Sequence, residues 1–146
     1  MTTIERPQSG SERSLDQPVM TFDLPAILAE LKREPNWQKA HRNSIALLKQ
    51  PELRVVLVAL QAGAEVASHQ AESPVTIQVV EGRVTVRGEA GEQVLGTGML
   101  LTLWAGVEHS VYAGEESAFL LTLVSESLHP MEVHVVAVSM SDGGGV

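Results

Sequence analysis

Two histidines, His69 and His109, stand 40 residues apart in a chain of 146 residues that contains no cysteine. Each closes a short run that begins with glycine, Gly63 to His69 in one case and Gly106 to His109 in the other. A neutral imidazole can bind a transition metal, form hydrogen bonds or exchange a proton near neutral pH. Without cysteine, the strong metal ligands available are His, Asp and Glu, and neither a thiolate nucleophile nor a disulfide framework is possible.

The stretches that must position these histidines have the period of β-strands. After Arg42, runs rich in strand-forming residues occur at about 44–50, 53–61, 75–81, 83–87, 92–95, 99–104, 108–112 and 117–124. Turn signals such as Glu81-Gly82 separate them. No helical crossover lies between them, so a parallel α/β sheet is not expected. This rhythm predicts an all-β barrel or sandwich.

One helix is expected before the strands. Asp23 can cap its start, and Pro25 suits its first turn. The apolar residues that follow at helical spacing are Leu24, Ile27, Leu28 and Leu31. The pattern predicts a short N-terminal amphipathic helix that ends near Glu34, before Pro35.

The glycines and histidines keep the spacing of the two cupin motifs. The first stretch resembles Gly, five residues, His-x-His, three or four residues, Glu, six residues, Gly; the second resembles Gly, five residues, Pro-x-Gly, two residues, His, three residues, Asn. The matching positions are Gly63, His69 and Gly82 in the first motif and Gly98, Gly106 and His109 in the second. Over residues 43 to 124 the chain therefore resembles a single-domain cupin of the cupin-2 type. The resemblance implies a double-stranded β-helix, a jelly-roll-like barrel.

The metal-binding part of the first motif is incomplete. Ala71 stands where that motif has its second histidine, and Val75 stands where it has glutamate. Neither side chain can bind a metal, and two imidazoles alone make a weak site. Glu72 could join His69 and His109 only through a bulge or kink, because neighbouring strand residues point to opposite faces. The resemblance leaves two alternatives open, a weakly held divalent transition metal or no metal.

The residues around the two histidines predict an apolar pocket. Strand alternation places Val75, Ile77 and Val79 inward beside His69. The same alternation places Val107 and Val111 inward beside His109. Small-molecule sites commonly combine apolar walls with a few polar groups. The same side chains could equally be ordinary core, since the wall of a small barrel's cavity is also its core.

Two functions and one plain alternative follow from this pocket. The first function is a binding module that holds a small organic molecule between apolar walls, with the two histidines as polar anchors. The second is a metal-dependent cupin enzyme of oxygenase or isomerase type, in which Glu72, water or substrate completes a two-histidine site. The plain alternative is two partly buried, hydrogen-bonded histidines with no further role. Whether the chain is an enzyme stays open.

Composition argues against several partners. The net charge is −8, and the ten Lys and Arg residues are scattered, whereas nucleic-acid binders cluster basic residues against phosphates. No stretch approaches the roughly 20 apolar residues that cross a bilayer. Residues 1 to 18 lack the apolar region of a secretory signal, so a cytoplasmic protein is expected.

Three segments and a homodimer are expected. Residues 1–19 read as a flexible N-terminal arm, 20–124 as the helix plus the barrel, and 125–146 as a C-terminal strand, at about 131–139, and a frayed tail. The helix and the late strand could each cover a neighbour's sheet. Small cupins often form dimers, so the resemblance implies a homodimer.

Overall fold

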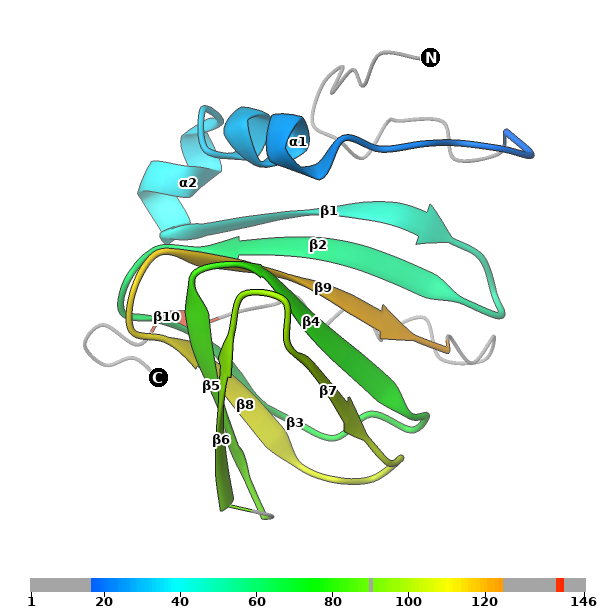
Figure 1. Cartoon of the computed structure of the whole chain (residues 1–146), viewed down its shortest axis with the longest axis vertical. Helices are drawn as coiled ribbons and strands as arrows, with labels where there is room; N and C mark the ends of the chain where they lie inside the picture. Colours follow the sequence, from blue (N-terminus) through cyan, green and yellow to red (C-terminus); the bar gives the residue numbers. More distant parts are fainter. Residues whose placement is uncertain (1–16, 90, 125–138, 141–146) are drawn as a thin grey trace.

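Two five-stranded sheets face each other, and two helices lie on the outer side of one of them (Figure 1). This computed structural model describes residues 17–89 and 91–124, together with residues 139 and 140; at positions 68, 69, 139 and 140 only the backbone is described. The helices are α1 (Leu24–Leu31) and α2 (Pro35–Ala40). The strands are β1 (Arg42–Lys49), β2 (Arg54–Leu60), β3 (Ala64–His69), β4 (Val75–Glu81), β5 (Arg83–Gly88), β6 (Gly91–Gly96), β7 (Leu100–Leu103), β8 (His109–Ala113), β9 (Ser117–Leu123) and β10 (Ser139–Met140).

The sheets are interleaved in sequence, as a jelly-roll barrel requires. Sheet A has the order β1-β2-β9-β4-β7, and sheet B has the order β10-β3-β8-β5-β6. Every described pair is antiparallel. Consecutive strands β4 and β5 therefore lie in different sheets, and the turn at Gly82 between them adopts a φ of +77°. The all-β prediction is confirmed.

All eight strands that the sequence predicts between residues 44 and 124 are present, with ends shifted by at most two residues. Two elements were missed. Strand β3 was not predicted because a register irregularity between Val66 and His69 interrupts its alternation. Helix α2 was not predicted because a proline such as Pro35 can follow the end of one helix or occupy the first turn of the next, and here it does the latter.

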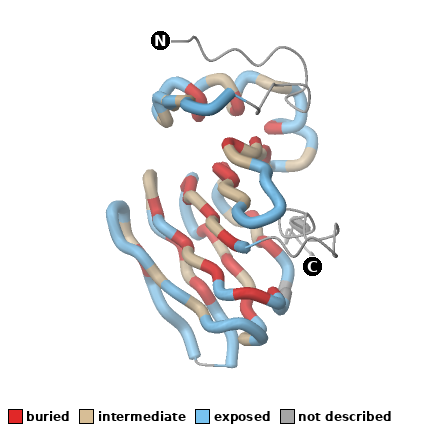
Figure 2. Tube along the Cα trace, turned by 90° about the vertical axis from the view of Figure 1, so that its right-hand side faces the viewer, coloured by how far each residue is buried: buried red, intermediate tan, exposed pale blue. Residues whose placement is uncertain are grey.

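Two apolar cores hold the layers together, and Figure 2 shows buried residues alternating with intermediate or exposed ones along the strands. The larger core fills the space between the sheets and includes Val58, Ile77 and Phe119. The smaller core lies between the helices and the outer side of sheet A. Because sheet A packs against apolar residues on both faces, the side chains on both sides of β2 are apolar and its sequence is a continuous apolar run.

Helix α1 covers its own chain's sheet. Asp23 caps it, accepting a hydrogen bond from the backbone N–H of Ala26 at 3.1 Å. Its buried residues Ile27, Leu28 and Leu31 belong to the smaller core, together with Leu57 of β2. The apolar face that could have covered a neighbour's sheet is thus used within the chain.

The ends of the chain are described only in part. Of the predicted arm, residues 17–19 are described, and the predicted strand 131–139 lies outside the described residues except for position 139. Ser139 and Met140 form β10, which pairs with β3 at the edge of sheet B. No helix in the described ranges is long and apolar enough to cross a membrane.

Candidate functional site

The two histidines occupy directly opposite positions on neighbouring strands. His69 ends β3, His109 begins β8, and the antiparallel register of these strands pairs the two residues. Residues directly opposite in an antiparallel pair share one face of the sheet, with Cβ atoms typically about 5 Å apart. Two positions 40 residues apart in the sequence are therefore adjacent in the fold.

A register irregularity in β3 determines which residue of β8 lies opposite His69. Val66 pairs with Val111, and His69 pairs with His109, so three steps along β3 correspond to two along β8. Val66 and Val111 both belong to the core between the sheets. Strict alternation from Val66 would leave position 69 out of phase with His109, and the extra residue in β3 restores the backbone pairing of the two positions. The bulge is what aligns position 69 with His109.

His109 is nearly buried at the start of β8, with 7% of its surface exposed. Its Nδ1 lies 3.0 Å from the carbonyl oxygen of Val107. A carbonyl oxygen only accepts, so this hydrogen bond places a proton on Nδ1. In the neutral ring Nε2 is then the atom with a lone pair, able to accept a hydrogen bond or to bind a metal.

A glycine lies beside His109 on the other side. The register of β5 and β8 pairs Gly88 with His109, two positions beyond the buried Val86 on the same face. A Cβ atom added at Gly88 would collide with the carbonyl oxygen of Glu108 and lie 3.3 Å from the Cα of His109. The absence of a side chain at this position lets β5 approach the start of β8 closely.

Most of the predicted apolar lining is in the core between the sheets. Val75, Ile77, Val79 and Val111 are at most 3% exposed and belong to that core. Val107 differs, because it precedes β8 and is only partly buried. Four of the five side chains predicted to line the pocket are therefore inward and apolar, while a cavity between them stays a prediction.

The positions that ordinarily complete a metal site hold no donor atom. Ala71 and Val75 are buried, with exposures of 7% and 3%. Glu72 is exposed, whereas Ala71 and Ser73 on either side of it are buried. Among the side chains that the structure describes, no group of three or more His, Asp or Glu could hold a metal ion. The described residues thus do not fit the full ligand set of a catalytic metal.

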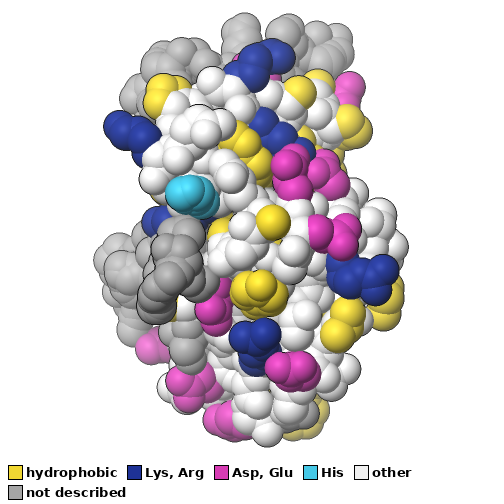
Figure 3. Space-filling view, turned by 90° about the vertical axis from the view of Figure 1, so that its left-hand side faces the viewer, with side chains coloured by type: hydrophobic (Ala, Val, Ile, Leu, Met, Phe, Trp, Pro, Cys, Tyr) yellow, Lys and Arg dark blue, Asp and Glu magenta, His cyan; other side chains and the backbone are white. Residues whose placement is uncertain are grey.

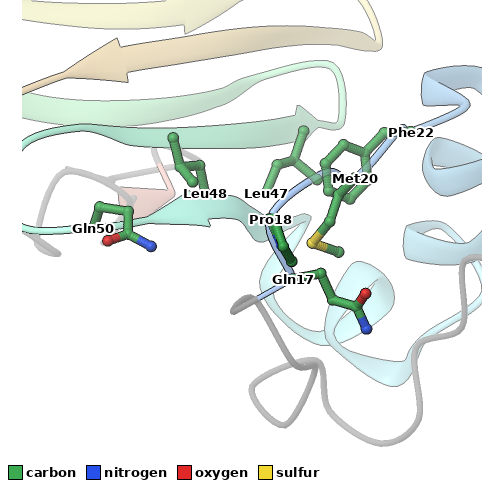
Figure 4. Close-up of a pocket in the computed structure, with 7 residues that line it drawn as sticks. All are labelled: Gln17, Pro18, Met20, Phe22, Leu47, Leu48 and Gln50. Atoms are coloured by element: carbon green, nitrogen blue, oxygen red, sulfur yellow. The ribbon is translucent and has the colours of Figure 1, made fainter.

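A separate groove lies on the outer side of sheet A and was not predicted from the sequence (Figure 4). Its volume is about 400 Å³. The lining residues come from the segment before α1 and from the end of β1: Gln17, Pro18, Met20, Phe22, Leu47, Leu48 and Gln50. The signal available in the sequence was the pair of apolar residues, Met20 and Phe22, that alternate ahead of the helix cap.

Comparison with solved structures identifies the architecture. A cupin superfamily protein from Desulfitobacterium hafniense is 14% identical and has a TM-score of 0.56, with 57% of this chain and 77% of that chain covered. A cupin-2 domain containing protein from Shewanella frigidimarina is 17% identical with a TM-score of 0.56, covering 69% and 91%. Salicylate 1,2-dioxygenase from Pseudoaminobacter salicylatoxidans, in adducts with gentisate, is 18% identical with a TM-score of 0.67, covering 89% of this chain but 39% of that one.

These likenesses show the fold. No protein-family model and no curated protein matches the sequence. At identities below one fifth, the structural neighbours carry no residue roles to this chain.

Proposed function

From the premise that this chain has the cupin fold, we propose that it binds a small organic molecule in an apolar pocket of its barrel, anchored by His69 and His109. The pocket takes its shape from inward side chains of both sheets, and its polarity from the imidazoles. The ligand class that suits this chemistry is a largely apolar, compact molecule with one hydrogen-bonding group.

The pairing of His69 with His109 is the observation that carries this proposal. A bulge brings position 69 into phase with a nearly buried histidine, and the side chains nearby on the same face are aliphatic. The Nδ1 hydrogen bond to the Val107 carbonyl oxygen makes Nε2 the acceptor nitrogen of the neutral ring, the atom that suits a donor group on a ligand. A buried acceptor among apolar walls discriminates strongly between ligands with and without a donor.

Benzene and phenol test the proposal, because they share the same aromatic ring and only phenol carries a hydroxyl that can donate a hydrogen bond. Binding of each is followed by NMR, with the imidazole ¹⁵N signals of His109 as the reporter. We expect phenol to bind more tightly and to move the Nε2 signal. In His109→Ala the advantage of phenol should vanish while benzene still binds, and Ser110→Ala, the next residue along β8, should behave as wild type. Equal affinities of wild type for both probes would contradict the proposal.

The competing function is a metal-dependent cupin enzyme in which Glu72, water or substrate completes a two-histidine site. Elemental analysis after purification without added metal separates the two. Metal content far below one per chain supports the binding module, since two imidazoles hold a divalent ion weakly. Close to one metal per chain, lost in His109→Ala, would replace the binding module with the enzyme.

A further inference from the structure

Among the strand residues that the structure describes, those on the outer face of sheet A beyond the helices include no ionisable side chain. The strand registers align one residue from each strand in a row across the sheet: Leu48, Val55, Thr122, Thr76 and Thr102. The next row toward the helices continues with Leu120, Gln78 and Leu100. The row begins at Leu48, which also lines the groove beside β1. We call these two rows, with Trp104 and Val124 at the strand ends, the uncharged face.

Large apolar side chains are exposed on this face. Trp104 is 83% exposed and Leu100 is 56% exposed. Trp104 continues the alternation of the exposed residues Leu100 and Thr102 just past the end of β7. Val124, 42% exposed, does the same past the end of β9. Exposed apolar residues gathered on one face mark an interaction surface, whereas exposed residues scattered singly do not.

The outer face of sheet B provides an internal comparison. There Arg87 forms an ion pair with Glu92 at 3.1 Å and lies 4.8 Å from the ring centre of Tyr112. Glu65 of β3 is paired with Tyr112 on the same face. Acidic and basic side chains are also interspersed on the side of the molecule shown in Figure 3. One outer face of the sandwich is thus built for solvent, and the uncharged face is not.

We propose that the uncharged face is the interface at which two copies of this chain associate. Each copy has a net charge of −8, so two copies repel each other wherever they present acidic surface. A face without ions lets them approach with the least repulsion and with no charge to desolvate. A partner recognised by charge would find nothing on this face to pair with. A two-fold axis brings the same patch of both copies together, so the patch must fit itself. An uncharged surface can do this without pairs of oppositely charged groups.

Trp104 is the anchor of this interface. Burying a tryptophan removes on the order of 200 Å² from water, about a quarter of the roughly 800 Å² per partner in an interface of standard size. Leu100, Val124 and the groove at Leu48 extend the same surface. Interface energy commonly concentrates in such aromatic residues, so a single change at Trp104 should abolish association.

Sedimentation of the full chain tests the interface at chain concentrations from about 1 to about 100 μM, the range that reveals micromolar association. We expect wild type to reach twice the 15.7 kDa mass of one chain. Trp104→Glu should remain at the mass of one chain, because two buried carboxylates would face each other. Thr102→Lys places a charge on the same face without removing apolar surface, and it should also stay monomeric. Circular dichroism of both variants establishes that they fold.

The matched control is Val94→Glu. Val94 is 51% exposed and pairs with Thr85 on the outer face of sheet B, so this variant should dimerise as wild type does. Fluorescence gives a second readout, because the other tryptophan, Trp37, is 6% exposed. The emission of Trp104 should shift to the blue as wild type associates. A wild type that stays monomeric, a dimer that survives both charged changes on sheet A, or a dimer lost equally in Val94→Glu would each overturn the proposal.

Discussion

Replacing Gly82 with alanine should destabilise the fold far more than an ordinary glycine change. Gly82 links β4 to β5 with a φ of +77° and is the closing glycine of the first motif. An alanine Cβ there would collide with the carbonyl oxygen of Glu116 and lie 2.5 Å from Ser117 Oγ and 2.9 Å from Ser117 Cα. Two of these three atoms belong to backbone, so the chain itself must move.

The magnitude can be built from three costs. The left-handed backbone costs a non-glycine residue about 1 kcal/mol, and overpacking typically costs about 1–3 kcal/mol. Ser117 is fully buried, and its Oγ accepts a hydrogen bond from the Arg83 N–H at 3.0 Å. Disturbing that buried hydroxyl adds about 1 kcal/mol or more. Together these costs give an expected loss of about 3–5 kcal/mol, a large part of the stability of a small domain.

Two other glycines separate these costs, with urea denaturation followed by circular dichroism as the assay. Gly98 has a φ of +89° and open space around the added Cβ, so Gly98→Ala should lose only the backbone cost, about 1 kcal/mol. Gly96 has open space and no positive φ, and Gly96→Ala should lie within about 0.5 kcal/mol of wild type. If Gly82→Ala loses no more than Gly98→Ala, the steric argument at the β4–β5 turn is wrong.

Three further changes test the capping, the charges and the site. Asp23→Ala should cost about 1 kcal/mol in urea denaturation, because it removes the cap of α1. Burial lowers the pKa of Lys32, but hydrogen bonds and charge from two glutamates outweigh it, so the net pKa lies above its ordinary 10.5. Lys32→Met should therefore lower the free energy of unfolding by about 0.5–1 kcal/mol at neutral pH. In urea denaturation this difference should fade as pH rises past about 10.5, because Lys32 then loses its proton. A difference between the two proteins that does not change with pH would contradict this reasoning. Gly88→Ala should displace the start of β8, so its ¹H–¹⁵N NMR spectrum should show the largest shifts at His109; unchanged His109 signals would argue against the close approach of β5.

The strands could be predicted because each is buried on a defined face. Alternation in β4 runs through Val75, Ile77 and Val79, all within 3% of complete burial, and the sequence places its ends without error. Glycines with positive φ mark the turns, as at Gly63 and Gly98. The pairing of strands distant in sequence, such as β2 with β9, depends on packing between sheets and carries no local signal.

The groove beside β1 and the uncharged face were missed for a related reason. Each gathers residues from segments far apart in the chain, as in the row from Leu48 to Thr102, and none of those residues is unusual alone. Only the sheet order makes them neighbours. Trp104 could have been noticed from the sequence as the aromatic residue that ends a strand, but its exposure of 83% could not.

The candidate site depends on a feature that periodicity alone would have misplaced. Counting from the inward-facing Val66, strict alternation puts position 69 on the outer face, so a purely periodic argument separates the two histidines. The cupin-like spacing predicted their approach, and the irregular register of β3 against β8 supplies the physical reason. A bulge adds one residue to one strand and reverses the phase beyond it. His69 and His109 lie opposite each other because β3 departs from regular strand pairing between Val66 and His69.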